Sequence, residues 1–376
     1  MVLPVIFAEK PSQAKAYADA FQHTNTKEGY IEVTDHRFFD DRAYITWGYG
    51  HLVELVSPEQ YNAAWKQWKL EQLPMFPDQF QFQVSNDKKK QFNIAKKLLN
   101  NSSQIIVATD CDREGENIAR SIISLTGAAN KPTKRLWINS LEVDEIQKGF
   151  QKLRDGNNYL SLYKEAQTRQ FSDWLVGMNA SRLYTLLLQQ RGMQGVFSVG
   201  RVQTATLYLL YKRQREIEEF VSHPYFTFQG EATINNDSFD VKHKQRFKTK
   251  EEAQKLLQEK GIVVGVNDGL VQALTKELKK EKSPKLHSLS SLQSAANKKW
   301  KYSPSEVLKI AQTLYEKKIL SYPRTDSHYI TGSEFNYIKD NLLNYQKCLN
   351  VNMEIAYPEA RKRYVDNSKV VELSRV

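Results

Sequence analysis

Strand-like and helix-like patterns alternate along the first part of the chain. An apolar, partly β-branched run is followed by a stretch with helical spacing, and the same alternation returns further along. The predicted strands lie at 2–8, 29–35, 43–52, 103–110 and 134–139, and the predicted helices at 12–21, 91–99 and 115–125. Strands that alternate with helices indicate a sheet with parallel strands covered by helices. We therefore predict one α/β domain over residues 1–150.

The pattern changes after residue 150. Helical spacing dominates residues 151–219, strand-like alternation returns over 220–278, and a second helical region occupies 279–376. Within the middle region the predicted elements are strands at 225–234, 238–243 and 261–266 and a helix at 250–259. In the last region, the run from Ser303 to Glu306 has the signature of a capping box with proline in the first helical turn.

The composition favours a folded protein with a polyanionic partner. The 376 residues carry a formal net charge of +11, and lysines gather at 88–90, 279–282 and 298–301. Clustered positive charge favours phosphate binding, with nucleic acid as the common partner, although a merely solvated basic surface is the alternative. No apolar run reaches the roughly 18 residues of a membrane span. With only two cysteines in the chain, we expect a reducing, cytoplasmic location and no membrane partner.

The densest chemistry follows the second buried strand. Asp110, Asp112 and Glu114 alternate there, and an extended backbone would turn all three carboxylates to one side. Hard oxygen ligands favour Mg²⁺, whereas favourable charge at a helix N-terminus is the alternative explanation. Glu9 and Lys10 follow the first strand, and a parallel sheet would place them beside Asp110. A glutamate in that position can act as a general acid or base, and a lysine can bind phosphate.

A tyrosine motif, SYPRTDS, lies near the end of the chain. Pro323 restricts the backbone of Tyr322, and Asp326 or Ser327 can cap a following helix, so the motif has an ordinary structural explanation when taken alone. The rest of the chain offers a second explanation.

Glu9 opposite Asp110 and Asp112 resembles the Toprim domain, which occurs in topoisomerases, primases and some nucleases. Four segments in order then resemble the type IA DNA topoisomerases, with the spacing of the topoisomerase III branch. These segments are AEKPS at 8–12, TDCDREGE at 109–116, SVGRVQT at 198–204 and SYPRTDS at 321–327. The resemblance covers nearly the whole chain.

This resemblance implies a multidomain fold of α/β and α parts. The implied domains are an N-terminal Toprim (Rossmann-like) domain at 1–150, the first part of a helical DNA-binding domain at 151–219, the first part of a β-rich arch at 220–278, and a helical, winged-helix-like domain bearing the tyrosine at 279–376.

The resemblance also implies a reaction. Tyr322 would attack a backbone phosphorus of single-stranded DNA and form a 5′-phosphotyrosyl bond, so that the strand is rejoined without ATP. Glu9 would act as general acid for the leaving 3′-oxygen, while Lys10 and Arg324 would stabilise charge on the phosphate. Mg²⁺ is the implied cofactor, and its implied ligands are Glu9, Asp110, Asp112 and Glu114.

Other residues are implied to handle DNA by the same resemblance. They are Ser198, Gly200, Arg201, Gln203, Arg169, Asp173 and Gln312. For Arg169 and Asp173, four residues apart on a predicted helix, an ion pair within the helix is the alternative. For Ser198 the alternative is a helix cap.

One family feature is missing from the sequence. Type IA enzymes carry a histidine motif shortly after a segment like RYVDNSKV, but here no histidine follows His328. Relatives are also much longer, so we expect this chain to bind single-stranded or negatively supercoiled DNA as a monomer and to be impaired in strand passage. A helicase is a candidate partner. The alternative functions are a Toprim nuclease or primase-like enzyme, and a non-catalytic remnant that binds single strands.

Overall fold

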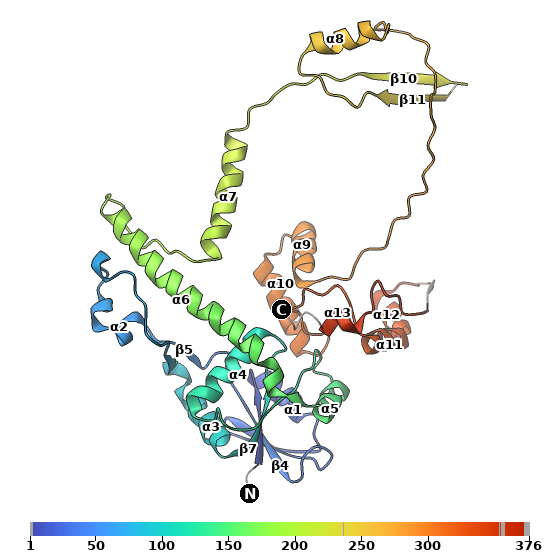
Figure 1. The fold of residues 1–376 in the computed structure, drawn as a ribbon. Coiled ribbons are helices and arrows are strands. Elements are labelled where there is room, and N and C mark those ends of the chain that lie inside the picture. Colours follow the sequence, from blue (N-terminus) through green and yellow to red (C-terminus); the bar gives the residue numbers. More distant parts are fainter. Residues whose placement is uncertain (1–2, 236, 353, 355–357, 372–376) are drawn as a thin grey trace. The chain divides into compact units, whose positions relative to one another are not determined.

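The computed structural model describes residues 3–235, 237–352, 354 and 358–371. They form two compact units, the first of residues 1–201 with 284–376 and the second of residues 202–283 (Figure 1). Each unit is described by itself below. The finer division into four domains stays a prediction.

A seven-stranded sheet forms the centre of the first unit. Its strands are β1 (Leu3–Ala8), β2 (His23–Lys27), β3 (Tyr30–Thr34), β4 (Arg42–Trp47), β7 (Ser102–Ala108), β8 (Thr133–Arg135) and β9 (Arg154–Asp155). They lie in the order β2-β3-β4-β1-β7-β8-β9. β1 is parallel to both of its neighbours, and β7 is parallel to β8, whereas the outer pairs are antiparallel. The predicted parallel centre is therefore confirmed, and it brings the carboxyl ends of β1 and β7 to one edge.

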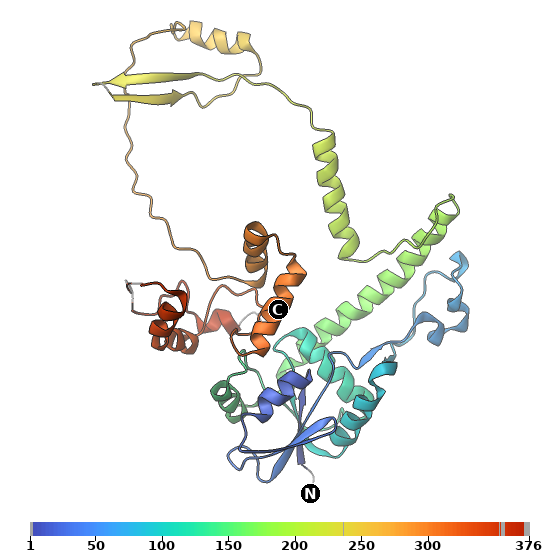
Figure 2. The same ribbon diagram turned by 180° about the vertical axis from the view of Figure 1, so that it is seen from behind.

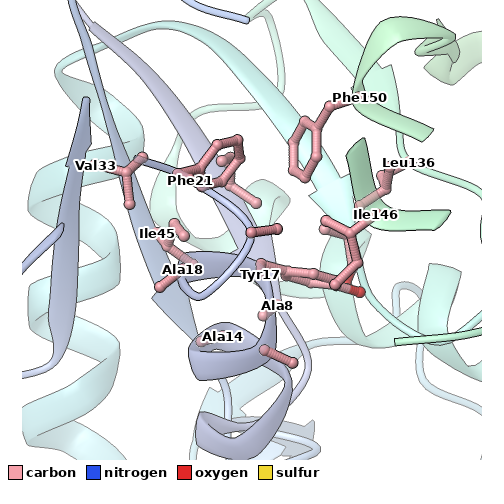
Figure 3. Packing of buried hydrophobic residues seen from close by; sticks show 14 of the residues in the cluster. Ala8, Ala14, Tyr17, Ala18, Phe21, Val33, Ile45, Leu136, Ile146 and Phe150 are labelled. Carbon is pink, nitrogen blue, oxygen red and sulfur yellow. The ribbon is translucent and has the colours of Figure 1, made fainter. Parts of the chain in front are cut away.

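Helices cover both faces of this sheet. They are α1 (Pro11–Ala18) and α5 (Val143–Gln151) on one face, and α3 (Lys89–Asn100) and α4 (Arg113–Thr126) on the other. A hydrophobic cluster lies on each face of the sheet. Successive side chains of β1 point to opposite faces, so Ile6 belongs to the first cluster and Phe7 to the second. Figure 3 shows the first cluster, in which Phe21 and Phe150 pack with ring centroids 5.0 Å apart. Burial on both faces explains the nearly continuous apolar runs of β1 and β7.

The remainder of the first unit is mostly helical. The long α6 (Leu160–Gln189) packs against α4, and the last part of the chain contributes α9 (Leu289–Trp300), α10 (Pro304–Glu316), α11 (Gly332–Asp340), α12 (Leu342–Leu349) and α13 (Asn367–Val371). α9 and α10 lie side by side (Figures 1 and 2). The predicted capping box at Ser303 is confirmed, with Pro304 in the first turn of α10. Between β4 and α3 lie the antiparallel pair β5 (Val53–Leu55) and β6 (Phe82–Val84) and the short α2 (Pro58–Tyr61).

The second unit contains α7 (Gln203–Glu218), the antiparallel hairpin of β10 (Gln229–Ile234) and β11 (Asp237–Lys242), and α8 (Lys250–Glu259). The prediction of a strand at 261–266 is wrong, since the structure has no strand over these residues. The apolar residues of that segment, including Val264 and Val266, are exposed. A strand needs a neighbour for its backbone hydrogen bonds, which an apolar sequence does not supply by itself.

No helix within the described residues is long and apolar enough to cross a membrane.

Candidate active site

Glu9 and Asp110 meet at the carboxyl edge of the sheet. The β1–β7 register pairs Ala8 with Ala108, so the residues that follow these strands lie side by side. The carboxylate of Glu9 accepts a hydrogen bond from the backbone N–H of Asp110 at 3.2 Å. Burial, and then the nearby charge of Asp110, raise the pKa of Glu9 to about 7. A carboxyl group with that pKa can both give and take a proton near neutrality.

Gln13, on α1, connects these two acidic residues. Its Nε2 donates to Asp110 Oδ1 at 3.0 Å, and its Oε1 accepts from the backbone N–H of Glu9 at 2.9 Å. The side chain is almost completely buried. Gln13 therefore fixes the orientation of the Asp110 carboxylate relative to Glu9. Gln13 was not among the predicted site residues, because a glutamine in a helix carries no signal of its tertiary partners.

Asp112 is the N-cap of α4 and holds the loop that follows β7. Its Oδ1 accepts the backbone N–H of Gly115 at 2.7 Å, as an N-cap does. Gly115 is required here, since a Cβ at this position would lie 2.3 Å from the carbonyl oxygen of Asp110. The loop that carries Asp110 and Asp112 is therefore packed directly on the first turn of the helix.

This cap corrects the expectation that the backbone stays extended through Glu114. α4 begins at Arg113, and helical geometry takes Glu114 out of the alternation that the extended chain would have given. Glu114 Oε1 instead lies 2.5 Å from His51 Nε2, and this hydrogen bond is the main reason that the pKa of Glu114 is lowered. Favourable acidic charge in the first helical turn, the alternative weighed above, applies to Glu114.

Tyr322 lies against the acidic loop. Its hydroxyl donates to Asp112 Oδ2 at 2.7 Å, and its backbone N–H donates to the carbonyl oxygen of Asn139 at 2.8 Å. The ring is buried and packs edge-on against Tyr315, with centroids 5.5 Å apart. Burial and the charges of Asp112 and Asp110 hold the pKa of Tyr322 well above its ordinary value. In this arrangement the phenol is neutral and is oriented by a carboxylate.

Two basic residues flank this pair. Arg324 Nη1 lies 3.9 Å from Asp112 Oδ2, and Lys10 Nζ lies 3.1 Å from Glu316 Oε1 on α10. Glu316 also accepts a hydrogen bond from Gln312 at 3.2 Å, so these two side chains lie on the same face of α10. Arg324 also lines the cavity that Tyr322 faces, whereas Lys10 is held by Glu316.

A cavity of about 860 Å³ opens over these groups. Acidic, basic and aromatic side chains line it, among them Glu9, Asp112, Glu114, Arg169, Tyr322 and Arg324. The structure thus brings together most of the predicted catalytic residues in one site of the first unit.

Arg135 is a further residue that the sequence analysis missed. Its side chain is buried at the end of β8 and donates to the carbonyl oxygens of Thr109 at 2.9 Å and Asp110 at 2.6 Å. Its Nε lies 2.6 Å from the carboxylate of Glu116, which is also fully buried. Arg135 thus fixes the backbone of the acidic loop, and Glu116 balances its charge. The sequence does not indicate this role, because most partners of Arg135 are backbone carbonyl oxygens.

The predicted DNA-handling residues lie on α6 and after it. Asp173 lies 3.8 Å from Arg169 and accepts a hydrogen bond from Arg201 at 2.7 Å. The ion pair within the helix is therefore present, and Arg201 extends it. Ser198 does not cap α7, whose N-cap is Val202. Gly200 precedes Arg201, and Gln203 begins α7 in the second unit.

The acidic residues offer oxygen donors of the kind that Mg²⁺ prefers. Within the described ranges, no three His, Cys, Asp or Glu side chains converge as a metal-binding group. Mg²⁺ in phosphoryl-transfer sites is commonly held by one or two carboxylates together with phosphates and water, so the neighbouring Asp110 and Asp112 fit it chemically. Glu114 contacts His51 in this structure, and the full ligand set of Glu9, Asp110, Asp112 and Glu114 stays a prediction.

A family profile described as DNA topoisomerase matches residues 157–372, more than half of the chain. The chain belongs to the DNA topoisomerase family. A Toprim domain profile matches residues 4–141, and so covers both Glu9 and the acidic loop. The predicted family and the predicted order of an α/β domain before a largely helical part are both confirmed.

Named relatives agree with this topoisomerase assignment. DNA topoisomerase 3 of Staphylococcus haemolyticus (strain JCSC1435) is 38% identical over 341 residues, and that of Staphylococcus aureus (strain USA300) is 37% identical over 341 residues. Each match covers 90% of this chain but 45% of the relative, so the chain spans less than half of the length of these relatives. Full-length topoisomerase I of Thermotoga maritima has a similar fold, with a TM-score of 0.60 and 23% identity over 92% of this chain and 52% of that one.

The raised pKa of Glu9 predicts a pH-dependent stability. Between pH 4.5, the ordinary value, and about 7, the folded state holds a proton that the unfolded state has released, so Glu9 makes stability fall as pH rises through this window. In buffer containing EDTA, Glu9→Gln should therefore be more stable than the parent at pH 8, by up to about 3 kcal/mol, and the difference should shrink towards pH 4.5. Urea unfolding followed by tryptophan fluorescence measures the free energy of unfolding of both proteins. Equal values for the parent and Glu9→Gln at pH 8 would contradict a raised pKa of Glu9 in the folded state.

Gln13→Met should slow the DNA cleavage that the sequence resemblance implies, while the fold is kept. The substitution preserves length and burial but removes both hydrogen bonds that orient Asp110 and Glu9, and loss of such supporting contacts commonly costs roughly 10-fold to 100-fold. The rate of covalent adduct formation is the measurement, with the exposed Lys15→Met on the same helix as control. Equal rates for the two variants would contradict the orienting role.

Proposed function

We propose that this chain carries the cleavage and rejoining site of a type IA, topoisomerase III-like enzyme that acts on single-stranded DNA. The observation that carries the proposal is the contact of Tyr322 with Asp112, in a cavity that also holds Glu9 and Arg324. A tyrosine hydroxyl, a carboxyl group with a pKa near neutrality and a guanidinium together suit transfer of a phosphoryl group to and from tyrosine.

In the proposed reaction the Tyr322 oxygen attacks a backbone phosphorus of the bound strand. A new P–O bond to tyrosine forms, the P–O3′ bond breaks, and the phenol proton passes to Asp112, its hydrogen-bonded acceptor. Glu9 gives its proton to the departing 3′-oxygen, which becomes a hydroxyl. Rejoining is the reverse: Glu9 takes the proton back as the 3′-oxygen attacks the phosphotyrosine, and Asp112 returns a proton to Tyr322.

The remaining charged residues bind and orient the strand in this proposal. Arg324 and Lys10 would hold the phosphate, and Lys10 must leave Glu316 to do so. Asp110 would hold Mg²⁺ together with phosphate and water, so that Asp112 stays available as the proton acceptor of Tyr322. Mg²⁺ when bound would offset the acidic charge and attract DNA phosphates. Arg169 and Asp173 on α6, with Arg201 from the segment that follows it, would line the path of the strand. Ser198, Gly200, Gln203 and Gln312 are proposed to contact DNA as well.

Partners and location follow from this proposed substrate. The chain would act on single-stranded or negatively supercoiled DNA, as a monomer and where bacterial chromosomal or plasmid DNA is found, with a helicase as a candidate partner. The topoisomerase 3 name of the relatives supports the branch assignment.

A covalent-trapping experiment tests the proposal against its alternatives. A single-stranded oligonucleotide labelled at its 3′ end is incubated with the protein, with and without Mg²⁺, and the reaction is stopped with detergent. The proposal predicts label at the mass of the protein, because the 5′ end of the labelled fragment stays on tyrosine. A cut, protein-free labelled fragment would indicate a Toprim nuclease, and binding without any cut would indicate a non-catalytic single-strand binder.

A further inference from the structure

The stretch from Pro284 to Ser305 is unusually basic. It contains four lysines and no aspartate or glutamate. Lys298, Lys299 and Lys301 gather at the carboxyl end of α9, and all three are exposed. The next acidic residue, Glu306, is held in the capping box of α10 by the N–H and hydroxyl of Ser303. Positive charge at this end of α9 is therefore not offset by an acidic residue from the same stretch.

Two aromatic side chains lie exposed within this cluster. Trp300 is 58% exposed and Tyr302 is 44% exposed, and their ring centroids are 6.4 Å apart at an interplanar angle of 32°. The ammonium of Lys299 lies 4.7 Å from the centroid of the Trp300 ring. Isolated exposed aromatic residues need no explanation, but two neighbouring rings among three lysines do.

The turn that carries these rings is held in place on both sides. Asn297 Nδ2 donates to the carbonyl oxygen of Tyr302 at 3.0 Å, and Gln293 Nε2 donates to that of Pro304 at 3.0 Å. The capping box then begins α10. The aromatic rings therefore project from a fixed turn between two helices. Binding of a ligand would cost little backbone conformational entropy, because the turn is already ordered.

We propose that Lys298, Lys299, Trp300, Lys301 and Tyr302, the Trp300 platform, form a second binding site for single-stranded nucleic acid. Bases would stack on the exposed rings, and the lysines would contact the phosphates on either side, which is the combination that sequence-independent single-strand binding uses. Lysine is depleted in protein interfaces, so the same surface is a poor match to a protein partner.

The platform lies at the far end of a helix that starts near the candidate active site. Leu286 and His287, which precede the N-cap Ser288 of α9, line the active-site cavity, and the 12 residues of α9 span about 18 Å. A strand that occupies the cavity could thus continue to the platform along this helix. The inference rests on the proposed substrate, a single DNA strand, but not on cleavage.

Binding of fluorescent oligo(dT) of increasing length, followed by anisotropy in a Tyr322→Phe background, tests the platform. Trp300→Ala should weaken binding of long oligonucleotides about 5-fold or more and leave short ones, which reach only the cavity, unchanged. Trp300→Phe, which keeps a stacking ring, should retain most of the affinity. The matched control is Tyr337→Ala, which removes an aromatic side chain that is also 58% exposed.

A second pair of variants separates the platform from general charge. Lys298, Lys299 and Lys301 changed together to alanine should reduce the salt-dependence slope by about 2. The same number of charges removed at Lys279, Lys280 and Lys282, where the stretch 276–285 has no aromatic residue, should weaken long oligonucleotides less.

The proposal of a second binding site would be overturned if the two triple variants weakened binding of long oligo(dT) equally. It would also be overturned if Trp300→Ala bound long oligo(dT) as tightly as its parent. If a covalent adduct still formed in the trapping experiment, the proposed function would stand without it. If no variant, nor the parent, bound oligo(dT) at low salt, both proposals would fall.

Discussion

Tyr322→Phe is expected to abolish the covalent DNA adduct while binding of single-stranded DNA persists. Phenylalanine has no oxygen with which to form a phosphoester, so the loss should be complete rather than partial. The ring can keep its edge-on contact with Tyr315. The hydrogen bond to the carboxylate of Asp112 is lost, and we expect stability to fall by about 1–3 kcal/mol.

The control for this variant is a second tyrosine in the same cavity. Tyr329 also lines the cavity, and its hydroxyl accepts a hydrogen bond from Lys369 at 3.3 Å. Tyr329→Phe should retain the adduct on a denaturing gel. If Tyr322→Phe kept the adduct and Tyr329→Phe lost it, Tyr322 would not be the nucleophile.

Arg135→Ala is expected to cause the largest loss of stability, about 3–5 kcal/mol. The substitution removes one of the two cations beside the buried carboxylate of Glu116 and leaves only Arg120, whose Nε lies 3.3 Å away. It also removes the donors that hold the carbonyl oxygens of Thr109 and Asp110. Because the acidic loop would lose its support, the rate of adduct formation should fall in the fraction of protein that stays folded. Urea unfolding gives the stability directly.

A double substitution distinguishes the buried charge from the lost hydrogen bonds. Arg135→Met combined with Glu116→Leu removes both fully buried charges and keeps much of the volume. Arg120 loses Glu116 but keeps its hydrogen bond to the carbonyl oxygen of Gly156 at 2.6 Å, so the double variant should be more stable than Arg135→Ala alone. It should still be impaired in cleavage, since no donor reaches the carbonyl oxygen of Asp110. A stability of Arg135→Ala within about 1 kcal/mol of the parent would contradict the account of this ion pair.

The sheet edge could be predicted because it depends on local patterns and one general rule. The apolar runs of β1 and β7 indicated buried strands, and parallel pairing was enough to place Glu9 beside Asp110. The capping box of α10 follows from three residues and was equally accessible. These features depend on interactions close in sequence or on strand order alone.

The supporting contacts could not be predicted because they are tertiary. Gln13 and Arg135 act on backbone groups and carboxylates about 100 and 25 residues away along the chain, respectively. The position of Glu114 depended on whether Asp112 ends an extended segment or caps a helix, and sequence spacing allows both. The segment 261–266 has the composition of a strand but lacks a neighbour in the described structure.

The central claim is that Tyr322 becomes covalently attached to DNA, and identifying the modified residue tests it most directly. The trapped complex would be digested with nuclease and protease, and the peptide that retains a nucleotide would be sequenced by mass spectrometry. The account predicts a nucleotide joined through its 5′-phosphate to the Tyr322 oxygen, within the segment ILSYPR at 319–324. A nucleotide on any other residue, or an adduct-free peptide from DNA that has been cut, would contradict it.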